Sequence, residues 1–98
     1  MIFFQAFDAI LSPVFDTSAP EHGSIETNGG GVSYTTPYSL TDCPSVVVRC
    51  GTSAEGLPIG VQIVAAPWRD EVAFAVAARL ERELGGWSPP PWCLRERL

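Results

Sequence analysis

The stretch SVVVRCGTSAEGLPIGVQIVAA, residues 45–66, decides the fold of this chain. Its two ends, 45–50 and 59–66, are rich in β-branched residues, which favour the pleated surface of a sheet. Between them lies 51–58, where the Gly, Ser and Pro residues typical of turns gather. Because the connection is so short, we predict that the two strands pair as an antiparallel hairpin.

Two further elements are predicted on either side of this hairpin. The apolar run within 7–15 ends at Ser12-Pro13, which indicates a strand covered on both faces that stops where proline cannot donate to a ladder. Residues 1–6 resemble the last turn of a helix. A helix is predicted over 70–84, with Asp70 as its N-cap and Gly85-Gly86 as its end. Its apolar face is expected to comprise Ala73, Val76, Ala77, Leu80 and Leu84.

The segment from Asp16 to Asp42 shows no clear period, and Gly29-Gly30-Gly31 and Pro37 interrupt it. A loop this long is uncommon inside a compact domain and is usually functional or disordered, or has packing partners elsewhere. We favour the last alternative, because the strands around it are expected to be fully buried. One helix covers only one face of a three-stranded sheet, so the predicted elements do not make a complete core.

Composition excludes several classes of function. The chain has 98 residues, a net charge of −5 and six bases, all of them arginine. With no basic run, it is a poor candidate for binding nucleic acid or an anionic membrane. No apolar stretch reaches the length of a membrane span, and residues 1–8 lack the positive leader of a signal peptide. The predicted compartment is therefore the cytoplasm.

Other catalytic and metal-binding sets find little support. His22 is the only histidine, so a Ser-His-Asp or Cys-His set would have to combine it with Ser24, Asp16 or Cys43. No nucleophile elbow is present, and we interpret His22 as an exposed loop residue.

The three cysteines, Cys43, Cys50 and Cys93, are odd in number and lack the paired spacing of zinc sites, which favours reduced, buried thiols. No phosphate loop follows the triple glycine, and we expect no metal and no cofactor. Packing or interface roles are expected for the three tryptophans, Trp68, Trp87 and Trp92.

Four segments, in order, carry a resemblance. Residues 57–64, LPIGVQIV, resemble the GLPxGxQ strand of the amidase signature family. Residues 48–51, VRCG, are similar to the preceding strand of that family, and 38–44, YSLTDCP, resemble its aromatic-Asn-Leu-Thr-Gly-x-Pro segment. Upstream, 7–13 resemble an aromatic-Asp-x-Leu-Leu-x-Pro strand, and downstream the helix is similar to the closing helix of the family. The resemblance covers about 7–84.

This chain departs from the family pattern at three positions. Ser39 stands where Asn is usual, Asp42 where Gly is usual, and Arg49 where Pro is frequent. Asp42 matters most, because Gly often marks a backbone conformation that other residues adopt only at a cost.

The resemblance implies an α/β fold: the C-terminal part of the mixed-sheet α/β/α amidase fold, incomplete on its own. The domain expectation is a partial amidase domain over 1–98 with an extended tail at 85–98. Enzymes of this family cleave carboxamide C–N bonds with a nucleophilic serine, a bridging serine in a cis peptide bond and a lysine.

The Gly-Ser-rich loop that holds these serines has no counterpart here, and the sequence contains no lysine. A serine needs a positioned base to act as a nucleophile. We therefore expect no catalytic residue in this chain, no activity of the chain alone, and a small-molecule amide substrate only in the full-length context. The alternative is a non-catalytic interaction module or sheet-completing partner, which self-associates or docks a complementing chain.

Overall fold

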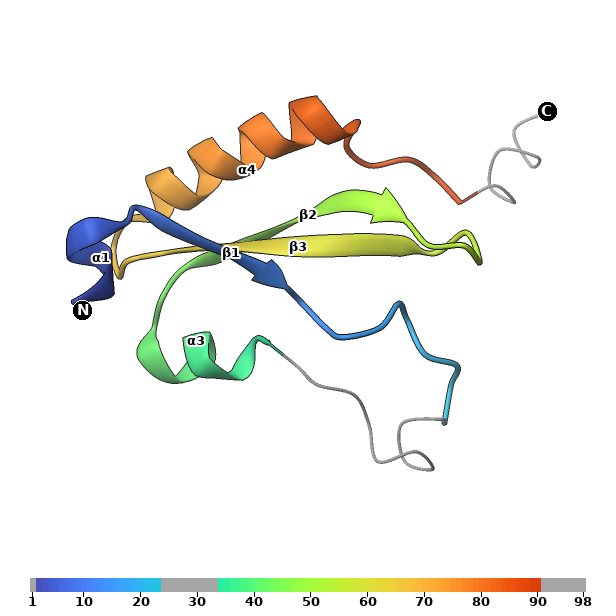
Figure 1. Cartoon of the computed structure of the whole chain (residues 1–98), viewed down its shortest axis with the longest axis horizontal. Helices are drawn as coiled ribbons and strands as arrows, with labels where there is room; N and C mark the ends of the chain where they lie inside the picture. The colour runs from blue at the N-terminus through green and yellow to red at the C-terminus, as the bar shows by residue number, and fades with distance from the viewer. Residues whose placement is uncertain (1, 24–33, 91–98) are drawn as a thin grey trace.

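The computed structural model describes residues 2–23 and 34–90. In chain order the elements are α1 (Phe3–Ala6), β1 (Ala9–Pro13), α3 (Thr36–Thr41), β2 (Ser45–Thr52), β3 (Pro58–Ala65) and α4 (Asp70–Leu84). The architecture is α/β, with a small open antiparallel sheet and helices, as Figure 1 shows. This agrees with the predicted partial amidase fold.

The sheet has three strands in the order β1-β3-β2, so the last strand in sequence lies in the centre. Both pairs are antiparallel, and Ile63 of β3 lies between Leu11 of β1 and Val46 of β2. The predicted hairpin is confirmed, and β1 ends at Pro13 as predicted. A β-bulge between Arg49 and Gly51 shifts the register near the turn of the hairpin.

The turn between β2 and β3 explains why the hairpin closes at 53–57. Ser53 and Leu57 share two hydrogen bonds: the Ser53 N–H donates to the Leu57 carbonyl at 2.7 Å, and the Ser53 hydroxyl accepts from the Leu57 N–H at 3.1 Å. Gly56 has a φ of 87°, a conformation that glycine adopts without a side-chain clash.

Helix α4 covers one side of the sheet, where it packs on β2 and β3. It buries Ala73 and Ala77, with Val76 and Leu80 half-buried, so four members of the predicted face are confirmed. Leu84, the last residue of the helix, is not buried, since 40% of its surface is exposed. Small alanines at the centre of the contact let the helix approach the strands closely.

The two ends of α4 differ in how well the sequence predicts them. Gly85, with a φ of 90°, ends the helix as expected. The prediction of Asp70 as N-cap is wrong by one position: Arg69 is the N-cap, and Asp70 is the first helical residue. Asp70 and Glu71 then place negative charge in the first turn, where the helix dipole favours it.

The short helix α3 is absent from the elements predicted from the sequence. Pro37 interrupts the pattern, yet proline is well tolerated in the first turn of a helix, and Pro37 lies there. In Figure 1 α3 lies on the side of the sheet opposite α4. On that second face the hydrogen bond from Gln62 Nε2 to the Tyr34 carbonyl links the sheet to the segment 34–42, and α3 itself buries no residue. The triple glycine at 29–31 lies outside the described residues.

The other described elements nevertheless cover the apolar side chains of the sheet only in part. Ile63, Val64 and Ala65 at the end of β3 are fully buried, but the exposed fractions of Leu11, Val47 and Ile59 on the three strands are 52%, 54% and 41%. These exposed apolar side chains agree with the expectation that the described elements do not make a closed core.

Replacing Ile63 by Ala should reduce the free energy of unfolding by about 2–5 kcal/mol, because it opens a cavity at a fully buried position. The matched control is Ile59→Ala, the same change on the same strand at a position 41% exposed, where the loss should be much smaller. Urea unfolding of the two variants measures this difference. Equal losses would contradict the assignment of the core to the end of β3.

Candidate functional site

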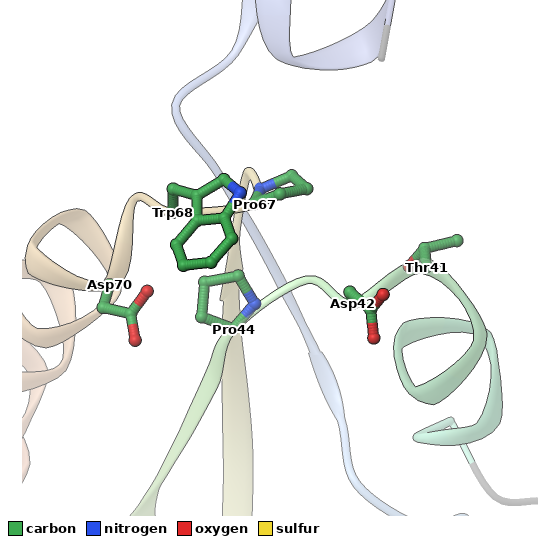
Figure 2. Close-up of a pocket in the computed structure, with 6 residues that line it drawn as sticks. All are labelled: Thr41, Asp42, Pro44, Pro67, Trp68 and Asp70. Carbon is green, nitrogen blue, oxygen red and sulfur yellow. The ribbon is translucent and has the colours of Figure 1, made fainter.

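A cavity of about 590 Å³ lies at the end of the sheet where β2 begins and β3 leads into α4. Its lining comes from the end of α3, the loops that follow α3 and β3, and the start of α4: Thr41, Asp42, Pro44, Pro67, Trp68 and Asp70. In Figure 2 the carboxylates of Asp42 and Asp70 lie on either side of Pro44, and the Trp68 ring lies over it. The two acidic groups therefore come from segments far apart in the sequence.

Two of these lining residues have a backbone conformation that is costly for them. Asp42 has a φ of 58° and Trp68 a φ of 69°, and they are the only non-glycine residues with positive φ in the described ranges 2–23 and 34–90. The left-handed region costs an L-residue roughly 1–2 kcal/mol. Asp42 ends α3 in this conformation, at the position where the family pattern has Gly. The backbone thus supports the interpretation that Asp42 replaces Gly at a position whose conformation is costly for other residues.

The two charged side chains that line this cavity, Asp42 and Asp70, are both acidic. None of its six lining residues is basic, and Asp70 begins α4. Next to the cavity, the backbone N–H of Glu71 and then the Arg69 side chain hold the pKa of the Glu71 carboxyl below its usual value. Arg69 Nε donates to Glu71 Oε1 at 2.8 Å, so this cation is directed to its neighbour on the surface.

A second cavity of about 320 Å³ shares Asp42 with the first. Its lining residues lie in or beside the segment 38–44 that resembles the family pattern: Thr35, Tyr38, Ser39, Asp42, Cys43 and Ser45. The Thr41 hydroxyl lies 3.4 Å from Cys43 Sγ and donates to it, which holds the buried thiol at the end of α3. Hydroxyls and a carboxylate are present here, but no lysine or histidine is among these six residues to activate a serine.

The catalytic candidates weighed from the sequence do not come together. Asp16 and His22 are exposed on the segment after β1, Cys43 is buried between α3 and β2, and Ser24 lies outside the described residues. Within the described part of the chain, no group of three His, Cys, Asp or Glu residues could hold a metal ion.

The expectations for the cysteines and tryptophans have mixed outcomes. Cys43 is buried as expected, Cys50 is half-buried, and neither forms a disulfide. Cys93 and Trp92 lie outside the described residues. A packing role within this chain is wrong for Trp68 and Trp87, which are 92% and 75% exposed; an interface role stays a prediction.

Arg49, at the third position that departs from the family pattern, has a structural role. Its Nη1 donates to the Gly86 carbonyl at 3.0 Å and its Nη2 to Thr52 Oγ1 at 2.7 Å. The side chain therefore ties β2 to the end of α4. Neither this link nor the prolines that line the first cavity could be predicted from the sequence pattern.

Comparisons with known proteins decide the family. The sequence profile described as Amidase matches residues 2–73. The chain belongs to the amidase family. Among the helices of the described ranges, none is long and apolar enough to cross a bilayer.

Curated relatives of this amidase-family chain include two kinds of protein. It is 39% identical to human fatty-acid amide hydrolase 2 over 80 residues, and 45% identical to the Danio rerio fatty-acid amide hydrolase 2-A over 81 residues. It is 30% identical over 96 residues to a glutamyl-tRNA(Gln) amidotransferase subunit from Bartonella quintana. These alignments cover 82%, 83% and 92% of this chain, but only 15%, 15% and 19% of the relatives. The chain thus spans less than a fifth of the length of the relatives it matches.

Restoring the family glycine by Asp42→Gly should raise the free energy of unfolding by about 0.5–1 kcal/mol. Glycine removes the cost of positive φ, although its greater freedom in the unfolded chain offsets part of the gain. The matched control is Asp16→Gly, the same change at an exposed position without positive φ, where no gain is expected. Thermal unfolding compares the two; a loss of stability in Asp42→Gly would show that its carboxylate outweighs the strain.

Proposed function

We propose that this chain is the C-terminal portion of an amidase that cleaves carboxamide C–N bonds, with the Ser-Ser-Lys catalytic residues supplied from outside it. One observation carries this proposal: the family profile matches 2–73, yet the sequence contains no lysine. Activity therefore belongs to a longer polypeptide or to a complex with a complementing chain, and the isolated chain is inactive.

Within such an enzyme the chain completes the sheet and contributes one wall of the substrate pocket. The two neighbouring cavities support this role, because the segment 35–45 lines both and includes 38–44, which resembles the family pattern. Its side chains supply hydroxyl groups, which can donate to and accept from an amide, and the Asp42 carboxylate, which can accept from an amide N–H. They bind and orient; the proton transfers need groups that lie elsewhere.

The substrate is a small molecule that carries a carboxamide. The names of the relatives, an amide hydrolase and an amidotransferase, share the amide chemistry that defines this substrate class. No cofactor enters the proposed chemistry. The reduced Cys43 and Cys50 fit a reducing compartment, and we place the function in the cytoplasm.

A second candidate function is a non-catalytic interaction module. The observations that favour it are exposed apolar residues on all three strands, Leu11, Val47 and Ile59, and two strands, β1 and β2, that each pair on one side only within the described sheet. Unpaired strand edges invite β-strand addition by another chain. The coding sequence upstream of Met1 discriminates: a continuing frame with a lysine and a Gly-Ser-Ser-Gly stretch supports the amidase and opposes the module.

The purified chain should show no amide hydrolysis above background, because it holds no base that could activate a serine. The measurement is release of amine from a simple aryl amide, followed through repeated purification and with and without a serine-directed inhibitor. Turnover that survives repurification and disappears with the inhibitor would contradict the proposal.

A further inference from the structure

The most constrained polar side chain of the described residues is Gln62, in the middle of the central strand. It is 1% exposed and is the one buried polar side chain in the described ranges. Its Nε2 donates to the Tyr34 carbonyl at 2.7 Å, to Ser12 Oγ at 2.9 Å and to the Pro13 carbonyl at 3.3 Å. Carbonyl oxygens only accept, so the amide orientation is fixed with nitrogen toward Pro13 and Tyr34.

The three acceptors join two parts of the chain that are distant in sequence. Ser12 and Pro13 end β1, and Tyr34 begins the segment that leads into α3. Tyr34 N–H also donates to the Val14 carbonyl at 3.0 Å, so the chain returns to the sheet at the point where it left it. The buried Gln62 amide needs acceptors, and these two backbone carbonyls and the Ser12 hydroxyl supply them.

We infer that Gln62 is a positioning residue: its amide fixes the segment 34–42 on the face of the sheet opposite α4. Through this segment it determines the positions of four residues that line the two cavities, namely Thr35, Tyr38, Ser39 and Asp42. The inference concerns the chain itself and does not depend on the proposed activity. If the isolated chain hydrolysed amides, this result would contradict the proposed function but would not affect the inference about Gln62.

Gln62→Glu tests this role with almost no change in shape, because it replaces the donating NH₂ by an oxygen that faces two carbonyls. The residues that hydrogen-bond to the Gln62 side chain or pair with position 62 in the sheet are Ser12, Pro13, Tyr34 and Val47, and the Tyr34 phenol is their one titratable group. With no cation among these neighbours, burial raises the pKa of the new carboxyl above its ordinary value. The protonated acid can still donate to one carbonyl. The segment should thus be held at low pH and released as the pH rises through the raised pKa.

The matched control is Gln5→Glu, which alters the only other glutamine in the sequence, at an exposed position in α1. The first readout is the protection of the Tyr34 amide against hydrogen exchange, corrected for the intrinsic pH dependence, with the buried Ala77 of α4 as the reference within the same molecule. The second readout is alkylation of Cys43 at pH 8, resolved from that of Cys50 by mass spectrometry.

In Gln62→Glu at pH 8 we expect Tyr34 protection to fall, and Cys43 alkylation to rise, by at least about tenfold, since the segment loses its hydrogen bond from position 62 and a buried carboxylate then faces two carbonyl oxygens. Ala77 protection and Cys50 alkylation should change by less than about threefold. Below pH 4 the variant should approach the unsubstituted chain, and Gln5→Glu should match that chain at every pH.

Gln62→Met keeps the test decisive if Gln62→Glu does not fold. Met has a similar length but no donor, so Tyr34 and Cys43 should be released at all pH values while Ala77 stays protected. Two outcomes would overturn the inference. One is equal loosening of Tyr34, Cys43 and Ala77 in both variants, which is the behaviour of a residue that merely fills the core. The other is a Tyr34 amide whose exchange is the same with Gln, Glu or Met at position 62.

Discussion

The burial of the end of β3, between β1 and β2 and beneath α4, is the constraint on which the rest of this structure depends. Residues 62–65 are all buried, and they pair with β1 on one side while 62–64 pair with β2 on the other. Helix α4 covers one face through Ala73 and Ala77. On the other face the Gln62 amide donates a hydrogen bond to the carbonyl of Tyr34, where the chain comes back to the sheet. Strand β3 is therefore the element around which the described sheet and its cover are organised.

Outside residues 62–65 the apolar side chains of the sheet are more exposed to solvent, and this exposure is relevant to function. Ile59, the second residue of β3, has 41% of its surface exposed, and Val47 and Leu11 on the flanking strands are more than half exposed. Each apolar side chain left in water forgoes roughly 1.5–3 kcal/mol of burial, against a typical net stability of about 5–15 kcal/mol for a small domain. A segment with a well-packed centre and uncovered surroundings is what the proposed amidase portion requires, because the remaining cover would come from the rest of the enzyme.

Elements that depend on local sequence could be predicted, whereas contacts between segments distant in the sequence could not. The hairpin and α4 follow from periodicity and turn residues, whereas the central place of β3 depends on pairing with Ala9–Pro13, some fifty residues away. Helix α3 does not follow from the sequence pattern, because Pro37 breaks the period there, although proline suits a first helical turn. At the candidate site, the family pattern singled out Asp42, whose φ is indeed positive. The acceptors of Gln62 lie 50, 49 and 28 positions away, and only the folded chain identifies them.

The central claim is that these residues form part of a larger core, and amide hydrogen exchange combined with sedimentation of the isolated chain tests it most directly. The incomplete cover of the sheet predicts that the chain alone is either partly molten, with weak protection toward the Ile59 end of β3 and at the edges of β1 and β2, or self-associated through those surfaces. A monodisperse monomer whose amides are strongly protected throughout residues 45–66 would show that the chain makes a complete core by itself, and would contradict the account.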